Sequence, residues 1–187
     1  MSHRIIILAS GAGTLAQAII DSRELDIEIV AVMSDHVDAP VLARASACSI
    51  ACEVIAMTSP RQLWDARMIE KVAQYKPDLV VSTGFMRILP PEFVHRFPTI
   101  NIHPALLPNF PGAHAVRDAL AAGVSVTGTT VHWVDAGIDT GPVITQMEVP
   151  VLKDDDEDTL HERIKKVERG LIVATIALIL PTLEHNA

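Results

Sequence analysis

An asparagine and a histidine two residues apart, Asn101 and His103, are the side chains in this sequence best placed for chemistry. They alternate with Ile100 and Ile102, so a short strand that buries both isoleucines directs both polar side chains to its other face. Pro104 lacks a backbone donor and ends this strand. The amide can donate a hydrogen bond to a developing oxyanion, and the imidazole can transfer a proton. A strand end with a satisfied histidine is the alternative interpretation.

A histidine that transfers protons needs a partner, and a loop later in the chain offers carboxylates. Asp139 lies between two glycines in residues 137–141, which can fold over the end of a sheet, and Asp135 lies nearer the preceding strand. A carboxylate beside an imidazole favours its protonated form and selects its tautomer. His132 would be a third ionisable group, although a strand histidine is more often a core residue. Because no His-x-His, Cys-x-x-Cys or His-Glu-x-x-His pattern occurs, we expect a site without metal.

Two further loops could hold ligands. Residues 10–14 form a glycine-containing turn between an apolar strand and a helix, where free backbone N–H groups and the helix dipole favour a phosphate. Residues 11–16 also match the dinucleotide-binding fingerprint in its final-alanine form, and Asp35 follows the second strand about where that fingerprint needs an acid. A dinucleotide-binding protein and a turn without a ligand are therefore the competing predictions. Residues 84–91 combine an arginine with apolar side chains and would suit a flat aromatic ligand, or else pack in the core.

The composition indicates one globular α/β domain over residues 1–187, since 49% of the residues are hydrophobic. A net charge of −8 and a pI near 5.4 argue against a general nucleic-acid binder but allow small anionic ligands. Neither a signal-peptide pattern nor a membrane-spanning segment is apparent, so we expect a cytoplasmic protein without membrane contact. Cys48 and Cys52 are expected to be ordinary reduced thiols.

The hydrophobic pattern predicts a Rossmann-like, mostly parallel twisted sheet with helices on both faces and an antiparallel edge. Strands are expected at residues 4–9, 27–33, 51–56, 79–83, 99–103, 124–134 and 142–151, and helices from residue 15 and at residues 39–49, 60–75 and 113–122. In the helix 60–75, Leu63, Met68, Ile69 and Val72 are expected to face the core. A final helix follows the acidic run 154–158, which suits a positive dipole end.

The candidate catalytic residues lie in a pattern that resembles the signature of a known family. The run from Asn101 to Pro108, followed by Gly112, His132 and Asp139-x-Gly141-Pro142, resembles the signature of the folate-dependent formyltransferases. The resemblance extends from the first strand to the last helix. The turn 10–14 and residues 84–89 are similar to the members that formylate glycinamide ribonucleotide in purine biosynthesis. Members that act on methionyl-tRNA, or that deformylate formyltetrahydrofolate, would carry a further domain, which we do not expect here.

The resemblance implies a role for each matching residue. His103 would be the general acid, or the cation that stabilises a tetrahedral intermediate; Asn101 would donate to the formyl oxygen, and Asp139 would favour protonated His103. The pterin of the co-substrate 10-formyltetrahydrofolate would be held by Met86, Arg87, Ile88, Leu89, Asp135, Ala136, Gly137, Ile138 and Asp139. The phosphate and ribose of the ribonucleotide would be held by Gly11, Gly13, Thr14, Leu15, Arg61, Lys165 and Glu168, the last three reaching from helices, with 165–168 expected at the start of the final helix.

The resemblance also implies direct formyl transfer between two small molecules, without metal or nucleic acid, by a monomer or homodimer. Two positions depart from the family pattern: Leu15 replaces a common asparagine, and Lys165 replaces a glutamine found in some relatives. A hydrolase that releases formate to water would use the same acid and the same oxyanion donor, so it remains an alternative.

Overall fold

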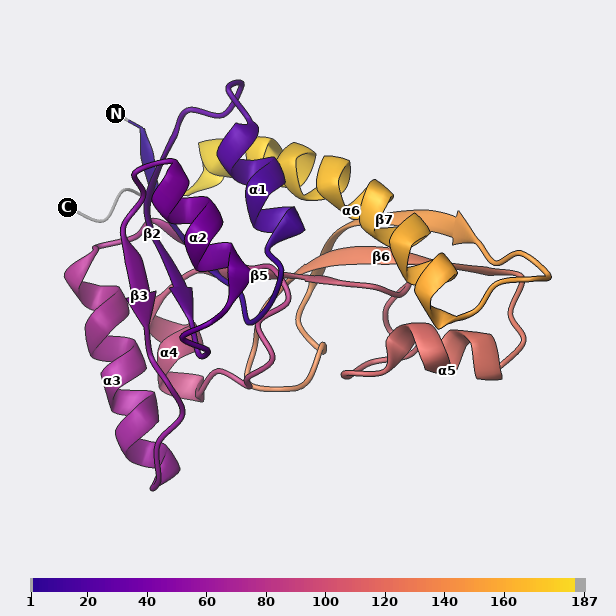
Figure 1. The fold of residues 1–187 in the computed structure, drawn as a ribbon, viewed down its shortest axis with the longest axis horizontal. Coiled ribbons are helices and arrows are strands. Elements are labelled where there is room, and N and C mark those ends of the chain that lie inside the picture. The colour runs from indigo at the N-terminus through magenta and orange to yellow at the C-terminus, as the bar shows by residue number, and fades with distance from the viewer. Residues whose placement is uncertain (1, 184–187) are drawn as a thin grey trace.

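A seven-stranded mixed sheet runs through the part of the chain that the structure, a computed structural model, describes: residues 2–183. Residues 1 and 184–187, which the predicted domain includes, lie outside this part. The elements in chain order are β1 (His3–Leu8), α1 (Thr14–Asp21), β2 (Ile27–Ser34), α2 (Pro40–Ala47), β3 (Cys52–Val54), α3 (Arg61–Gln74), β4 (Leu79–Ser82), α4 (Pro91–Arg96), β5 (Thr99–His103), α5 (Ala115–Ala121), β6 (Val126–Trp133), β7 (Val143–Pro150) and α6 (Glu157–Ile179), with a 3-10 turn at Leu180–Thr182. Figure 1 shows their arrangement.

The strand order is β3-β2-β1-β4-β5-β6-β7, and the first five of these strands are parallel. Strand β6 is antiparallel to both β5 and β7. The predicted mostly parallel sheet with an antiparallel edge is therefore confirmed. The reversal pairs residues 130–133 of β6 with residues 100–103 of β5, and His132 lies opposite Asn101.

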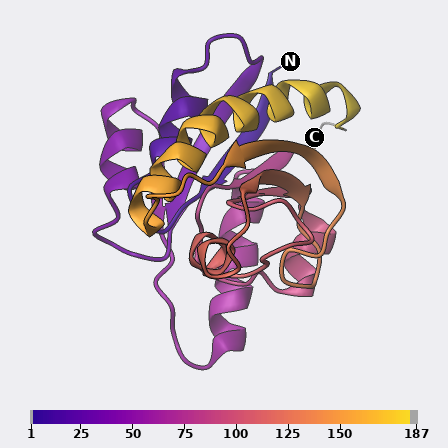
Figure 2. The ribbon, with the colours of Figure 1, turned by 90° about the vertical axis from the view of Figure 1, so that its right-hand side faces the viewer.

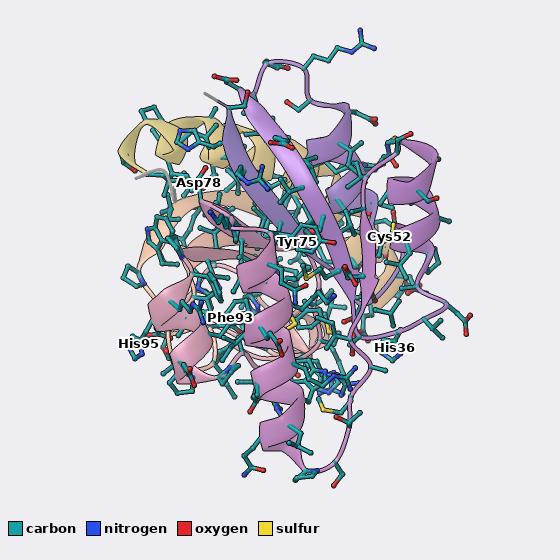
Figure 3. All side chains as sticks on the ribbon, turned by 90° about the vertical axis from the view of Figure 1, so that its left-hand side faces the viewer. His36, Cys52, Tyr75, Asp78, Phe93 and His95 are labelled. Carbon is teal, nitrogen blue, oxygen red and sulfur yellow. The ribbon has the colours of Figure 1, made fainter. Side chains whose placement is uncertain are left out.

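Helices cover both faces of the sheet because its central strands are apolar on both sides. Ile5 and Ile7 of β1 pack in a core with α1, α2 and α6, whereas Ile6 and Leu8 pack in a second core with α3 and α4. Figure 2 shows α6 crossing above the strands. Figure 3 shows α3 and α4 side by side over the opposite face. A smaller cluster joins α5 to α6 and β7 through Val116, Val149, Leu160 and Ile164.

One local prediction was wrong, and one helix was not predicted. Leu63 of α3 was expected to face the core but is 57% exposed, whereas the neighbouring Trp64 is fully buried. The Trp64 indole N–H donates to the backbone oxygen of Ile55 at 2.7 Å, which satisfies its polar atom in the core. Helix α4 was not predicted, because a six-residue segment that begins with proline offers little periodicity. Tertiary packing of Phe93 and Phe97 stabilises it.

The carboxyl ends of β1 and β4 form the point where the strand order reverses, since β2 and β3 lie on one side and β5 to β7 on the other. Open α/β sheets bind ligands at such a point. The loops after the two strands are joined there, because the Ser10 amide donates to the Gly84 oxygen at 3.1 Å. None of the helices within residues 2–183 is long and apolar enough to cross a membrane.

The turn after β1 requires a glycine at position 13, because the backbone there is left-handed and Val41 leaves no room for a side chain. Gly13 has a φ of +71°, and a Cβ built there would lie 2.4 Å from Cγ2 of Val41 in α2. We predict that Gly13→Ala lowers the free energy of unfolding by about 2–4 kcal/mol, the combined cost of a left-handed alanine and of overpacking.

Urea unfolding of both variants measures this effect, with Gly11→Ala as the matched control. A Cβ at Gly11 would meet nothing within 4 Å. The control should therefore stay within about 1 kcal/mol of the unchanged protein. Equal stability of the two variants would contradict the account of the turn.

Candidate active site

Asn101 and His103 lie at the carboxyl end of β5, on one face. Ile100 and Ile102 pack in the core beneath α1 and α6, and the alternation of the strand directs Asn101 and His103 to the opposite side. His103 is buried and Asn101 is partly buried. The two side chains predicted to share a face therefore do so. They lie at the carboxyl end of the sheet, the end at which open α/β sheets bind ligands.

The loop between β6 and β7 folds back so that Asp139, and not Asp135, reaches the histidine. Asp139 Oδ2 lies 3.4 Å from His103 Nδ1, and Oδ1 lies 3.5 Å from His132 Nε2. The Gly112 amide donates to Oδ2 at 2.8 Å. Burial alone would raise the pKa of the Asp139 carboxyl, but His132, the Gly112 amide and the charge of His103 together hold it below its usual value. The carboxylate is therefore ionised at neutral pH.

Both ring nitrogens of His103 face acceptors, an arrangement that suits a doubly protonated imidazolium. Nδ1 faces Asp139, and Nε2 lies 2.8 Å from the backbone oxygen of Phe110. Phe110 and Asp139 each have a φ of +53°, which is uncommon for residues with a side chain. Such strained conformations concentrate at functional sites, where the surrounding contacts hold them.

His132 is the residue at this site that the sequence prediction treated as an ordinary core residue. Its Nε2 lies 3.3 Å from Asn101 Nδ2, and its Nδ1 lies 2.9 Å from the backbone oxygen of Trp133. Since Nδ1 faces a carbonyl oxygen, an Nδ1–H can donate to it, and Nε2 lies between the Asn101 amide and Asp139 Oδ1. Only the β5–β6 register, which the sequence does not provide, could have placed His132 opposite Asn101.

The turn after β1 presents the amino end of α1. Gly13 is the residue before the helix and has no side chain that could cap it, so the first amides of α1 are open to an anion. Helix α2 holds the turn, because the Val41 amide donates to the Gly11 oxygen and Arg44 Nε donates to the Ala12 oxygen at 2.8 Å. Thr14 is the first helical residue, and Leu15 is partly buried against the core beside α6. The leucine side chain therefore contributes to packing.

Lys165 and Glu168 lie in the middle of α6, not at its start, because that helix begins at Glu157. Glu168 is only 3% exposed, and burial raises its pKa to about 7. The Thr129 hydroxyl lies 3.3 Å from Glu168 Oε1 and 3.1 Å from the His103 backbone oxygen, so it connects the carboxyl group to the end of β5. Lys165 Nζ lies 2.9 Å from Glu162 Oε1.

The loop predicted to hold the pterin exposes apolar side chains. Met86 and Ile88 are exposed, as is Ile138 in the Asp139 loop, whereas Leu89 is buried in the second core. Asp135 accepts from the Gly137 amide and the Thr140 hydroxyl, so it stabilises the turn that carries Ala136 and Gly137.

Two arginines border this loop. Arg61 donates to the Ile88 backbone oxygen and pairs with Asp65. These contacts connect Arg61 to residues 84–90, and its role in binding the ribonucleotide stays a prediction. Arg87 Nε donates to Asp35 Oδ2 at 2.6 Å, so its guanidinium is held at the carboxyl end of β2.

The contacts of Asp35 argue against the dinucleotide alternative. The side chain is fully buried, and its two oxygens accept from the Ser10 hydroxyl and from Arg87 Nε. Burial alone would raise the pKa of Asp35, but these two hydrogen bonds hold it below its usual value. The carboxylate is therefore not available for a ribose diol. Over residues 2–183, no group of three or more His, Cys, Asp or Glu side chains is arranged to hold a metal ion.

Glu168 should make the stability of the protein depend on pH. Its folded pKa of about 7 lies above the ordinary value of 4.5, so ionisation destabilises the fold, and the cost develops as the pH rises from about 4.5 to 7. We predict that Glu168→Gln, compared with the unchanged protein, gains about 3 kcal/mol of unfolding free energy between about pH 4 and about pH 8.

Denaturant unfolding at a series of pH values measures this difference. Glu162→Gln is the matched control, because Glu162 is an exposed carboxylate of the same helix. A Glu168→Gln difference that does not change with pH would contradict the assignment of a buried carboxyl group with a raised pKa.

The chain is similar to known proteins in both sequence and fold. The family model for formyl transferase matches residues 3–176. A phosphoribosylglycinamide formyltransferase of Mycobacterium tuberculosis is 50% identical over 181 residues, which cover 94% of this chain and 84% of the relative. That of Escherichia coli is 39% identical over 180 residues, 92% of this chain and 85% of the relative. The crystal structure of glycinamide ribonucleotide transformylase 1 from Symbiobacterium toebii superposes with a TM-score of 0.90 at 40% identity, over 94% of this chain and 86% of that one. The chain belongs to the formyl transferase family.

Proposed function

We propose that this protein transfers the formyl group of 10-formyltetrahydrofolate to the amine of glycinamide ribonucleotide in purine biosynthesis, the activity named for its phosphoribosylglycinamide formyltransferase relatives. The observation that carries the proposal is the cluster of Asn101, His103 and Asp139 at the end of β5. The cluster adjoins residues 84–90, a loop with exposed apolar side chains. The same end of the sheet also carries the amino end of α1, which is open to an anion.

The reaction exchanges one carbon–nitrogen bond for another. The amine attacks the formyl carbon, the formyl oxygen becomes negative in the tetrahedral intermediate, and the bond to the folate nitrogen then breaks. The attacking amine loses a proton and the departing nitrogen gains one, so no net acid or base is consumed. An oxyanion donor and a residue that moves a proton are therefore the two groups that this chemistry needs.

Asn101 is suited to stabilise the oxyanion. The Asn101 side-chain nitrogen lies 3.3 Å from His132 Nε2, a contact that holds the amide in one orientation and leaves an N–H for the formyl oxygen. A single donor of this kind contributes about 3–4 kcal/mol of transition-state stabilisation.

His103 is suited to supply the proton. The ionised Asp139 carboxylate faces Nδ1 and orients the ring, so the proton would reach the departing nitrogen from Nε2, which would exchange its contact with the Phe110 backbone oxygen for the substrate. The positive charge of the protonated ring would lie near the developing oxyanion. Proton transfer by a positioned side chain contributes about 10²- to 10⁴-fold in rate. No covalent intermediate is required for these steps.

The remaining predicted residues would bind and orient the two substrates. Exposed Met86, Ile88 and Ile138 offer an apolar surface to the flat pterin ring. The amides of the turn 11–14 would bind the phosphate, and Glu168 would accept from ribose hydroxyls. Arg61 and Arg87 border the folate side of the site. The cytoplasmic location and the monomeric or homodimeric state stay predictions from the sequence.

Turnover that depends on the ribonucleotide tests the proposal. We predict that the protein deformylates 10-formyltetrahydrofolate only when glycinamide ribonucleotide is present, with one formylated ribonucleotide formed for each folate product. Absorbance of the folate and chromatography of the ribonucleotide measure both products. Folate deformylation without the ribonucleotide would indicate a formate-releasing hydrolase, and no folate turnover would contradict the proposal.

A further inference from the structure

Asp35 is the acidic residue of the dinucleotide-binding fingerprint, and the proposed reaction does not use it. It follows β2 directly and is 4% exposed. Its Oδ1 accepts from the Ser10 hydroxyl at 2.6 Å, and its Oδ2 accepts from Arg87 Nε at 2.6 Å. His36 Nε2 lies 3.3 Å from Oδ2. Figure 3 labels His36 at this carboxyl end of the strands.

The Ser10 hydroxyl extends this contact into a short chain of hydrogen bonds. While it donates to Asp35, its oxygen accepts from the Met86 amide at 2.9 Å. A hydroxyl has one proton, so donation to Asp35 fixes its orientation and directs a lone pair at Met86. The Ser10 amide also donates to the Gly84 oxygen at 3.1 Å. Ser10 therefore joins two loops through its side chain and its backbone.

The three segments that meet at Asp35 follow three neighbouring strands. Ser10 follows β1, Asp35 follows β2, and residues 84–90, which we name the folate loop, follow β4. The first segment continues into residues 11–14, the turn proposed to bind phosphate, which we name the phosphate turn. The third segment carries the surface proposed to bind the pterin. A buried carboxylate thus connects the binding regions for two different substrates.

A charge at this depth is stable only because both of its oxygens have partners. Loss of one partner of a buried ion pair costs more than loss of an exposed one, since it leaves an uncompensated charge. The pair is also specific to the folate loop, because Arg87 and Met86 both belong to it. The phosphate turn has its own support from α2, where Arg44 donates to the Ala12 oxygen.

We propose that Asp35 is a positioning residue that holds the folate loop against the phosphate turn through Ser10 and Arg87. This inference rests on the proposed function, because it concerns how that site binds its two substrates. Asp35 acts through the loop and does not contact Asn101, His103 or Asp139 in any hydrogen bond or ion pair of residues 2–183.

The first test needs no substrate. We predict that Asp35→Asn and Ser10→Ala each accelerate hydrogen exchange of the Met86 amide about 10-fold, because the amide loses its oriented acceptor. Asp155→Asn is the matched control: the Asp155 side chain is only 4% exposed, and it pairs with Arg163 at 2.6 Å in a different part of the fold. Exchange measured by NMR should be unchanged at Met86 in this control.

The second test uses steady-state kinetics after the unchanged protein has been shown to transfer the formyl group. The folate KM should rise about 10-fold in both variants, while the ribonucleotide KM and kcat change less than about 3-fold. Unchanged Met86 exchange, or an effect on folate KM no larger than in the Asp155→Asn control, would overturn the inference.

The two tests separate this inference from the proposed function. Absence of formyl transfer by the unchanged protein would refute the proposed function, whereas the Met86 exchange would still report whether Asp35 holds the loop. A loss of kcat with unchanged KM would also overturn the inference, because it would place Asp35 in the chemistry. If Asp35→Asn does not fold, Ser10→Ala removes a single oxygen and decides the outcome.

Discussion

The site depends on one partly buried carboxylate, that of Asp139, which faces two imidazoles. Asp139 reaches His103 and His132 because the loop after β6 turns back over the end of the sheet, with Asp139 itself in a left-handed conformation. The Gly112 amide completes its environment and ties a second loop, which carries Phe110, to the same point. A neutral residue at position 139 would remove the negative charge that both imidazoles face. It would also remove the contacts that hold residue 139 in its left-handed conformation.

The mixed topology of the sheet is what brings these groups together. Parallel strands β1 and β4 supply the two loops proposed to bind the substrates, at the point where the strand order reverses. The antiparallel strand β6 places His132 opposite Asn101 and directs the Asp139 loop over the end of β5. On the opposite face of the sheet, Thr129 connects the buried Glu168 to the backbone of His103. The proposed catalytic and binding residues therefore share one end of the sheet, although they come from both halves of the chain.

Much of the fold could be predicted from the sequence, because the buried strands are continuous apolar runs and the helices between them are periodic. Asn101 and His103 were identifiable because alternation within one strand depends only on local sequence. The partners of Asp35 could not be predicted, since a carboxylate after β2 looks the same in the sequence whether it binds ribose or an internal arginine. The proximity of His132 and the burial of Glu168 depend on strand register and helix packing, and the fully buried Trp64 was missed because helical periodicity also allowed Leu63.

A double-mutant cycle on His103 and Asp139 tests most directly whether the two residues act as a unit. The account predicts that His103→Ala and Asp139→Asn each lower the single-turnover rate of formyl transfer at saturating substrates by about 10²-fold or more. Asp139 acts through His103, so the double variant should be no slower than the slower single variant. Two effects that multiply in the double variant would show that Asp139 acts independently of His103, and would contradict the account.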